Sequence, residues 1–427
     1  MNTNDKKRIV VIGGGFAGLN FIKHIDKKKF EVILVDKNNY HSFPPLFYQI
    51  ASSGLEPGSI CFPFRREFRK GRGRGASYVM GEVKNIDTSA KEVITEFERI
   101  GYDYLVIACG TTNNFFGNQT LVNDVFTVKS VSEAIRCRNE ILYRLERASL
   151  TKDKELKRRL LSFVVIGGGA TGVEVAGALG EMKRYIVPRE YPGISQDDIT
   201  IELLEGSDRL LGSMSEKSQK DALKYLGKLL VDVKLGHLLK EYSNDRITLD
   251  DGSTLTAGMV IWTAGITGVR IDLDSNLEPS RGGRWAVDGY NHIIGLDDNI
   301  YAIGDIALMC TDEYPKGHPQ LAQVALQQGK NLAKNLNRGI FKTSFKYKDK
   351  GTMATVGRNL AVADIKHYHM SGFPAWAAWM MIHLLSILGM RNKISVLIDW
   401  IWAYFSYGTS LRLLLKMSRY PQKIDSF

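Results

Sequence analysis

One pattern, a short strand followed by a glycine-rich turn and a helix, occurs twice in this chain. The first copy is RIVVIGGGFAGLNFIKHI, from Arg8, and the second is SFVVIGGGATGVEVAGAL, from Ser162. Both contain the spacing Gly-X-Gly-X-X-Gly, at Gly13, Gly15 and Gly18 and at Gly167, Gly169 and Gly172. The first glycine permits the sharp turn, the second admits a phosphate to the helix N-terminus, and the third lets helix and strand pack closely. The repeat predicts two dinucleotide-binding folds.

An acidic residue ends the strand that follows each glycine-rich turn. FEVILVD ends at Asp36, and ITIELLE ends at Glu205 after a longer connection. In dinucleotide-binding folds this carboxylate accepts hydrogen bonds from the adenosine ribose. A single glycine-rich turn is weak evidence because such turns are common, whereas two complete copies are strong evidence.

Composition limits the number of domains and the kinds of site and partner that this chain can have. The 427 residues, 44% apolar and 24% charged, suit a folded protein of two or three domains. The four cysteines are scattered without a Cys-X-X-Cys spacing, so we predict neither a metal site nor a dithiol relay. The net charge of +11 fits a basic soluble surface, an anionic lipid surface or nucleic acid. The strand signal begins so near the N-terminus that we expect no signal or transit peptide and a cytoplasmic catalytic part.

Further strands also end in glycine turns. YDYLVIACG predicts a strand from Tyr104 to Ala108 that turns at Gly110, and NIYAIGDIA places Asp305 between a strand and a helical run. An N-terminal glycine-rich turn that is completed much later by YAIGD resembles the flavoproteins with two dinucleotide-binding domains. The resemblance implies FAD in the first site, with Asp305 near its ribityl or phosphate region, and a nicotinamide nucleotide in the second. Asp305 also suits a helix N-cap.

Three further stretches, together with an apolar C-terminal tail, narrow the resemblance. DKNNYHSFPPLFYQIASSGLEP, GATGVEVAGAL and AQVALQQG are similar to sequences of the type II NADH dehydrogenases, which are single-chain NADH:quinone oxidoreductases. The most specific part is Ala-Gln-X-Ala-X-Gln, at Ala322, Gln323, Ala325 and Gln327. Disulfide reductases and sulfide:quinone oxidoreductases need cysteines beside the flavin, and none stands at the required spacing.

The resemblance implies an α/β fold with two Rossmann-like dinucleotide-binding domains, in which an inserted NADH domain splits the FAD domain. The expected FAD domain comprises residues 1–112 and 268–345, and the expected NADH domain comprises residues 113–267. Residues 346–427 are expected to form C-terminal strands and membrane-anchoring amphipathic helices.

Site residues follow from the resemblance by position. It implies a catalytic role for Glu174, where the nicotinamide meets the flavin, and for Gln323, at the flavin's other face, where quinone enters. Glu174 also suits the helix dipole, and Gln323 and Gln327 share a helical face that could be polar surface. The residues implied for FAD are Gly13, Gly14, Gly15, Phe16, Ala17, Gly18, Asp36, Lys37, Tyr48, Val83, Gly110, Gly304, Asp305, Ala322 and Gln323. Those implied for NADH are Gly167, Gly169, Ala170, Thr171, Gly172, Glu174, Glu205, Ala264 and Gly265.

The C-terminal tail is strongly apolar. The run from Ala375 to Met390 is roughly 24 Å long as a helix, which falls short of a bilayer crossing. Four of the six tryptophans occur in the tail and are consistent with an interfacial belt: Trp376, Trp379, Trp400 and Trp402. LRLLLKMSR places Arg412, Lys416 and Arg419 on one stripe, which predicts a basic amphipathic helix suited to anionic headgroups. A membrane-surface anchor is therefore our interpretation, and a buried helix pair, a dimer interface and a short transmembrane hairpin are the alternatives.

The predicted function is hydride transfer from NADH to FAD and two-electron reduction of a membrane quinone, menaquinone or ubiquinone, without proton pumping. The expected location is the cytoplasmic side of the inner (cytoplasmic) membrane. The expected partners are the quinone, the bilayer surface and a second copy in a homodimer, with no nucleic acid. The alternatives are a sulfide:quinone oxidoreductase and a non-respiratory NADH-dependent flavoprotein that binds nucleic acid or signals. The proton donor to the quinone is not identified, because His383 is the single ionisable residue in the first apolar run of the tail.

Overall fold

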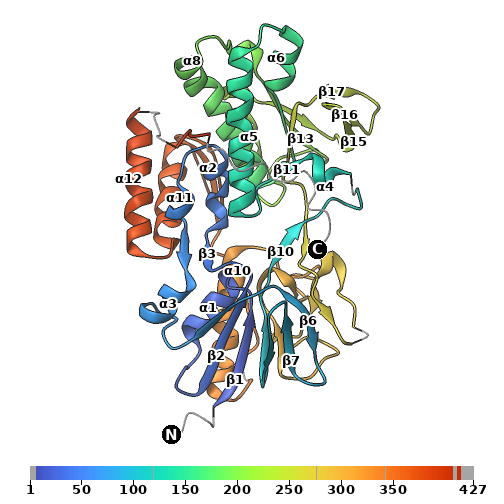
Figure 1. The fold of residues 1–427 in the computed structure, drawn as a ribbon, viewed down its shortest axis with the longest axis vertical. Helices are drawn as coiled ribbons and strands as arrows, with labels where there is room; N and C mark the ends of the chain where they lie inside the picture. Colours follow the sequence, from blue (N-terminus) through green and yellow to red (C-terminus); the bar gives the residue numbers. More distant parts are fainter. Residues whose placement is uncertain (1–5, 119, 276, 342, 407–410, 415–427) are drawn as a thin grey trace. The chain divides into compact units, whose positions relative to one another are not determined.

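A computed structural model describes residues 6–118, 120–275, 277–341, 343–406 and 411–414 (Figure 1). The chain forms two compact units, each assembled from three separate stretches. The first unit comprises Met1–Ser42, Cys61–Asn114 and Ile266–Lys350, and the second comprises Phe43–Ile60, Phe115–Gly265 and Gly351–Phe427. Each unit therefore contains one of the two glycine-rich turns.

The first unit is built on a parallel sheet of five strands in the order β22-β9-β1-β2-β5. These strands are β1 (Lys7–Ile12), β2 (Phe30–Asp36), β5 (Ser77–Met80), β9 (Tyr104–Ile107) and β22 (Ile300–Ala302). The central strand β1 is apolar and buried from Ile9 to Ile12, because both faces of a parallel sheet are covered. The helices α1 (Phe16–His24) and α10 (Ala322–Arg338) pack against each other beside this sheet (Figure 1).

The second unit repeats this arrangement with the strand order β11-β18-β12-β13-β14, again all parallel. Its strands are β11 (Phe126–Thr127), β12 (Ser162–Ile166), β13 (Thr200–Glu205), β14 (Asp232–Leu235) and β18 (Met259–Trp262). Its long helices are α5 (Val131–Leu150), α7 (Ala170–Glu181) and α9 (Glu216–Lys228). In both sheets the strand before the glycine-rich turn is central and pairs with the strand that ends in the acidic residue. The predicted pair of Rossmann-like folds is confirmed.

Shorter elements complete the two units. In the first unit they are β3 (Tyr40–Ser42), β4 (Cys61–Pro63), α3 (Phe64–Lys70), β6 (Val83–Asp87), β7 (Glu92–Thr95), β8 (Arg99–Gly101), β10 (Thr111–Asn113), β19 (Ile266–Gly268), β20 (Asp272–Leu273), β21 (Trp285–Ala286) and β23 (Ala307–Leu308). In the second unit they are α2 (Phe47–Ala51), α4 (Leu121–Asp124), α6 (Lys154–Leu160), α8 (Val187–Glu190), β15 (Leu239–Ser243), β16 (Arg246–Leu249) and β17 (Thr254–Thr256).

A three-stranded antiparallel sheet and two helices follow in the second unit. The strands are β24 (Thr352–Gly357), β25 (Leu360–Ile365) and β26 (Tyr368–Ser371), and the helices, at the red end of the colour scale in Figure 1, are α11 (Phe373–Ser386) and α12 (Met390–Ser406). Strand β24 lies directly on α7, because a Cβ atom at Gly177 would overlap the carbonyl oxygen of Val356. Strands were expected from residue 346, but residues 346–350 form no strand.

A half-buried polar cluster connects this antiparallel sheet to α9. The imidazole of His369 lies between two carboxylates, with Nε2 3.1 Å from Asp221 Oδ2 and Nδ1 3.2 Å from Asp364 Oδ1. The Ser218 hydroxyl donates to the same Asp364 oxygen at 2.9 Å. These contacts hold β25 and β26, and with them the start of α11, against the helix of the Rossmann-like fold.

The end of the tail is only partly described. Leu411–Leu414 are not helical, and Arg412 forms an ion pair with Glu190, so the expected amphipathic helix does not include them. Lys416 and Arg419 lie outside the described residues. Among the helices that the structure describes, none is both long enough and apolar enough to cross a membrane.

Candidate functional site

The first glycine-rich turn has the shape that a bound diphosphate requires. Gly13 has φ +96°, and a Cβ atom there would lie 2.6 Å from the carbonyl oxygen of Ala108. Gly15 caps α1 without a side-chain hydrogen bond and has open space around its missing Cβ. A Cβ at Gly18 would overlap the carbonyl oxygen of Gly13. Only glycine fits at positions 13 and 18, and the N-terminal amides of α1 meet open space at Gly15. This arrangement suits the diphosphate of a dinucleotide.

The second turn repeats this geometry. Gly167 has φ +107°, and a Cβ there would lie 2.9 Å from the backbone of Ala264. Gly169 caps α7 beside open space, and a Cβ at Gly172 would overlap the carbonyl oxygen of Gly167. The expected residues Ala170 and Thr171 form the first turn of α7, and Gly265 follows Ala264 with φ +84°. This turn is equally suited to a diphosphate.

The two acidic residues at the strand ends also make matching contacts. Asp36 Oδ2 accepts a hydrogen bond of 2.7 Å from the N–H of Gly14, and Glu205 Oε2 accepts one of 2.6 Å from the N–H of Gly168. Each carboxylate therefore binds the residue between the first and second glycines of its motif, Gly14 or Gly168, and lies beside the diphosphate position. Burial raises the pKa of Asp36, and the hydrogen bonds from backbone amides oppose that shift. Adenosine ribose hydroxyls would be hydrogen-bond donors to these carboxylates.

The YAIGD segment lies in the first unit at the short helix η7 (Gly304–Ile306). Gly304 has φ +77°, and a Cβ there would lie 2.8 Å from the Cβ of Ala17 in α1. The N–H of Gly304 donates to Oε1 of Gln328 at 2.7 Å, and the backbone oxygen of Asp305 accepts from Gln320 at 3.0 Å. Sequence reasoning missed the buried Gln328, although it lies in the quoted AQVALQQG stretch.

The other residues expected at the FAD site occupy the same unit, with one exception. Lys37 is exposed after β2, Val83 begins β6, and Gly110 has φ +71° with open space around it. Phe16 is the first residue of α1. Tyr48 belongs to the second unit, where it contacts a different set of residues described below.

A histidine that the sequence analysis did not single out supports the first turn. His41 is buried, and its Nδ1 donates to the carbonyl oxygen of Gly14 at 2.8 Å. Its ring meets the ring of Phe16 edge to face at 5.7 Å. Burial lowers the pKa of His41 to about 4, so the imidazole is neutral. A neutral ring that donates through Nδ1 stabilises the turn without placing a positive charge in it.

The glutamines of the Ala-Gln-X-Ala-X-Gln motif belong to a stripe of amide side chains along α10. Four amides recur every four residues and bind the extended segment 343–350: Gln323, Gln327, Asn331 and Asn335. Gln327 makes two hydrogen bonds with the backbone of Lys348, at 2.9 and 3.0 Å. Gln323 Oε1 accepts from the N–H of Lys350 at 3.1 Å. These side chains are therefore not simply polar residues on the surface, because they hydrogen-bond the segment at the end of the first unit.

A cavity of about 140 Å³ lies within the second unit. Polar groups reach it from α7, α2 and the turn between β24 and β25, and aromatic rings reach it from α11 and α12. The polar lining residues include Tyr48, Gln49, Glu174, Glu181 and Arg358, and the aromatic ones are Trp376, Trp379, Trp400 and Tyr404. An apolar cavity with a few converging polar groups is the usual form of a small-molecule site.

Glu174 is a buried acid of this cavity with a strongly perturbed pKa. Its side chain is 8% exposed, and burial raises its pKa to about 8, with a hydrogen bond from the backbone of Thr355 opposing the shift. The carboxyl group is therefore protonated near neutral pH. A buried carboxyl of this kind can hold and transfer a proton.

A hydrogen-bonded chain runs from α12 to Tyr48. Trp400 Nε1 donates to Gln49 Oε1 at 2.8 Å, and Gln49 Nε2 donates to the hydroxyl oxygen of Tyr48 at 2.8 Å. Burial raises the pKa of Tyr48 well above its usual value, and the charge of Glu174 adds to that shift. The chain links a helix of the tail to the polar end of the cavity.

His383 is held by the neighbouring turn of its own helix and does not line this cavity. Its Nδ1 donates to the carbonyl oxygen of Trp379 at 2.7 Å, and its ring stacks on the Trp379 ring at 3.9 Å. Burial lowers its pKa to about 4, which leaves it neutral, and it is absent from the cavity lining. The titratable side chains that do line the cavity include Glu181, which sequence reasoning missed and whose pKa burial raises.

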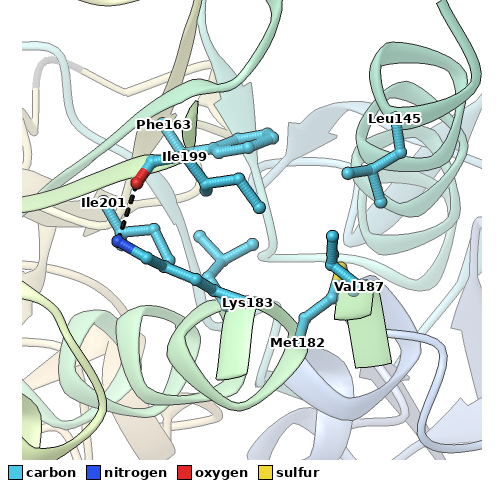
Figure 2. Close-up of a pocket in the computed structure, with 8 residues that line it drawn as sticks. Leu145, Phe163, Met182, Lys183, Val187, Ile199 and Ile201 are labelled. Atoms are coloured by element: carbon cyan, nitrogen blue, oxygen red, sulfur yellow. Dashed lines mark hydrogen bonds between the residues drawn. The ribbon is translucent and has the colours of Figure 1, made fainter. Parts of the chain in front are cut away.

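Two other features of the second unit are weaker candidates. A cavity of about 10 Å³ between α5, α7 and β13 is apolar except for Lys183, which donates to the carbonyl oxygen of Ile199 at 2.7 Å (Figure 2). This space is large enough for one water molecule at most. His237, Asp250 and Asp251 form a group with metal-binding donor types, but their side chains are 34–49% exposed and such groups are common without an ion. The absence of a resident metal stays a prediction.

The structure divides the two expected catalytic residues between the units. Gln323 lies in the first unit and Glu174 in the second. Their shared role around one flavin therefore stays a prediction, as do the individual cofactor contacts and the expected domain boundaries.

Comparisons with known proteins agree with this fold. Residues 7–329 match the family model of the pyridine nucleotide-disulphide oxidoreductases, and residues 350–406 match that of the NDH2 C-terminal domain. The class is thus a nucleotide-dependent oxidoreductase with two dinucleotide-binding folds. The type II NADH:quinone oxidoreductase Ndh of Mycobacterium tuberculosis is 31% identical over 419 residues, which cover 94% of this chain and 89% of that protein. The chain belongs to the type II NADH:quinone oxidoreductase family, as the sequence resemblance predicted.

Solved structures support the fold. NDH2 from Plasmodium falciparum, in complex with NADH, superposes with a TM-score of 0.88 at 23% identity, covering 96% of this chain and 100% of that one. The sulfide:quinone oxidoreductase of Aquifex aeolicus gives a lower TM-score of 0.72 at 17% identity, covering 94% and 96%. At these identities the likeness concerns the fold alone.

Proposed function

We propose that this NADH:quinone oxidoreductase binds FAD at the first glycine-rich turn, NADH at the second, and the quinone headgroup in the cavity beside Glu174. This position differs from the one beside Gln323 that the sequence resemblance implied, because Gln323 does not line the cavity. The cavity is the observation that carries the proposal. It joins a buried, protonated carboxyl to aromatic side chains of two apolar helices, as a quinone that arrives from a bilayer would require.

The chain's own residues bind and orient the reactants. FAD, when bound, supplies the redox chemistry that accepts hydride from NADH and returns two electrons to quinone. The amides at the starts of α1 and α7 bind the two diphosphates, and Asp36 and Glu205 bind the ribose hydroxyls. The overall reaction, NADH plus quinone plus one proton to NAD⁺ plus quinol, needs a proton donor. The carboxyl of Glu174 can deliver a proton to a quinone oxygen and then recover one from solvent.

A variant that fills the cavity tests the site. Ala178 lines the cavity on α7, and Ala178→Phe should slow reoxidation of the reduced flavin by ubiquinone-1 about tenfold or more, because the ring occupies the space of the headgroup. Stopped-flow absorbance should show unchanged flavin reduction by NADH. The control is Leu223→Phe, which adds a ring on the exposed side of α9. Unimpaired reoxidation in Ala178→Phe would show that quinone reacts elsewhere.

The outer surface of the tail helices supports binding to a bilayer surface. Their apolar side chains point away from the protein, with exposed fractions of 42–81%: Phe373, Met381, Ile382, Leu385, Met390, Ile394, Leu397, Ile398, Ile401, Trp402 and Phe405. The opposite face of α12 binds the turn at residues 57–59, through Ser395 to Ser59 at 3.2 Å and Asn392 to Gly58 at 3.4 Å. A helix with its polar face on the protein and its apolar face outward suits insertion into the membrane interface.

Flotation with liposomes tests this surface. Ile398→Glu together with Trp402→Glu should abolish flotation with phosphatidylglycerol–phosphatidylcholine vesicles, because two charges would enter the apolar interface. Leu223→Glu, on exposed α9, is the control. Retained flotation, with a change from dimer to monomer in sedimentation, would assign the surface to a second copy of the chain. The cytoplasmic side, the homodimer and the lack of a nucleic-acid partner stay predictions.

Sulfide oxidation is the weaker alternative. None of the four cysteines forms a disulfide, and burial raises the pKa of Cys61, Cys109 and Cys137 to about 12. Thiols held in the protonated form are poor nucleophiles. The arrangement does not favour attack by cysteine on a sulfide-derived sulfur.

A further inference from the structure

The last turn of α12 is capped by an arginine from another element. Arg358 lies in the two-residue turn between β24 and β25, and its guanidinium donates to the carbonyl oxygens of Tyr404 at 2.8 Å and Ala403 at 2.5 Å. The guanidinium also lies over the Tyr404 ring at 5.2 Å. The final four carbonyls of a helix have no partner within the helix, and a cation at that end complements the helix dipole. Arg358 therefore stabilises the end of α12 in three ways.

The same arginine is anchored to the opposite side of the cavity. Its backbone N–H donates to Glu181 Oε1 at 2.5 Å, and Glu181 is the last residue of α7, the helix that carries Glu174. Arg358, Glu181, Ala403 and Tyr404 all line the cavity. One residue thus connects the wall formed by α12 to the wall formed by α7.

Among the residues that the structure describes, most other polar contacts of α12 with the protein lie before this end of the helix. Within the described residues, Ser395, Asn392 and Trp400 bind the protein from the first half and middle of the helix, and beyond them Arg189 reaches the carbonyl oxygen of Ser406 at 3.3 Å. Apolar side chains dominate the outward face of the helix. Loss of the Arg358 side chain would remove its hydrogen bonds to two carbonyl groups and loosen the last turn of α12 beside the cavity.

We propose that Arg358 is a positioning residue for the reaction with quinone, because it holds Ala403 and Tyr404 in place as one wall of the cavity. This role rests on the proposed function of the cavity. Arg358 does not exchange electrons or protons with the substrate; it fixes the shape of the space into which the headgroup fits. The expected effect is therefore on quinone affinity and not on the reduction of the flavin by NADH.

Steady-state kinetics of the holoenzyme with ubiquinone-1 test this role. Arg358→Ala should raise the KM for ubiquinone-1 about tenfold, with a smaller change in kcat, because headgroup contacts are lost before the chemical step. Arg358→Lys keeps a cation near the helix end and should recover part of the loss. The rate of flavin reduction by NADH in stopped flow should match the unmodified protein in both variants.

A second arginine provides a matched control. Arg184 also donates to a carbonyl oxygen at a helix end, that of Lys228 in α9, but it does not line the cavity. Both Arg184→Ala and Arg358→Ala should lower the thermal unfolding temperature, because each removes a hydrogen bond at a helix end. Arg184→Ala should leave the KM for ubiquinone-1 unchanged. If Arg358→Ala does not fold, Arg358→Lys tests the proposal by itself. An unchanged KM and kcat in Arg358→Lys would refute the positioning role, because lysine cannot reproduce both hydrogen bonds of the guanidinium to the carbonyls of α12.

The variant Ala178→Phe separates this inference from the proposed function. If Ala178→Phe blocks reoxidation by ubiquinone-1 and Arg358→Ala leaves its KM unchanged, the positioning role is refuted and the cavity remains the quinone site. If Ala178→Phe has no effect, the cavity is not the quinone site and the proposed role of Arg358 is refuted with it. A raised KM in Arg358→Ala, with normal flavin reduction and a normal KM in Arg184→Ala, supports the role.

Discussion

Replacing Glu174 by glutamine should change how the stability of this protein depends on pH. Burial raises the pKa of Glu174 from 4.5 to about 8 in the folded protein. Below pH 4.5 the carboxyl is protonated in both the folded and unfolded states. Between the two values it is ionised only in the unfolded chain, so the unfolded state binds fewer protons and the free energy of unfolding falls as the pH rises.

The size of the effect follows from the interval between the two pKa values. Each pH unit between them removes about 1.4 kcal/mol from the free energy of unfolding, and the whole interval removes at most about 5 kcal/mol. Glutamine has nearly the same shape and no titrating proton. Glu174→Gln should therefore match the unmodified protein at the acidic end and become the more stable of the two as the pH approaches 8.

Urea unfolding, followed by tryptophan fluorescence at several pH values between about 5 and 8, measures this difference. Comparing the two proteins at each pH removes the contributions of the other buried acids, such as Asp36 and Glu181, whose pKa values burial also raises. The control is Glu155→Gln, which alters a carboxylate that is exposed to water on α6. If the unfolding curves of Glu174→Gln and the unmodified protein shifted in parallel with pH, the proposed protonated state of Glu174 in the folded protein would be wrong.

Three further predictions concern the two nucleotide sites and the amide stripe. Gln327→Leu should destabilise the first unit by about 2 kcal/mol in urea unfolding, because both hydrogen bonds to Lys348 are lost; an unchanged midpoint would mean that they contribute nothing. Asp208→Ala should raise kcat/KM for NADPH relative to NADH about threefold. Asp208 binds Arg209 at 2.7 Å, and its removal makes Arg209 available to the extra phosphate of NADPH. The effect is small because both side chains are exposed, and a fall in the relative kcat/KM for NADPH would contradict the prediction. Acid precipitation should release the flavin into the supernatant, because backbone amides and Asp36 bind it without a covalent bond; a yellow pellet would contradict this.

Much of the nucleotide chemistry could be predicted from the sequence because it is local. A glycine-rich turn, its strand and its helix lie within a few residues, and the positive φ values of Gly13 and Gly167 are needed wherever such a turn binds a diphosphate. The acidic residue at the end of the next strand is set by the same short unit. The apolar character of α11 and α12 can likewise be predicted from the sequence, because it depends on composition over about one helix length.

Tertiary structure alone decided the surroundings of these residues. The four-residue spacing of Gln323 and Gln327 predicts a shared helical face, but only the fold shows that this face binds the segment ending at Lys350. In the tail, the sequence indicated polar positions on α12, and the structure supplied their partners at residues 57–59. A side chain's partner depends on which distant segment packs beside it, and periodicity carries no information about that segment.

The amino-acid sequence by itself therefore determined the two dinucleotide folds, the family and the apolar tail, since each rests on contacts between near neighbours or on composition. It did not determine the state of Glu174, because an acid near the start of a helix is ionised unless something buries it. Strand β24, nearly two hundred residues later in the sequence, provides that burial by lying on α7 at Gly177. The cap of Arg358 on α12 has the same origin, since it joins three segments whose proximity arises only when the chain is folded.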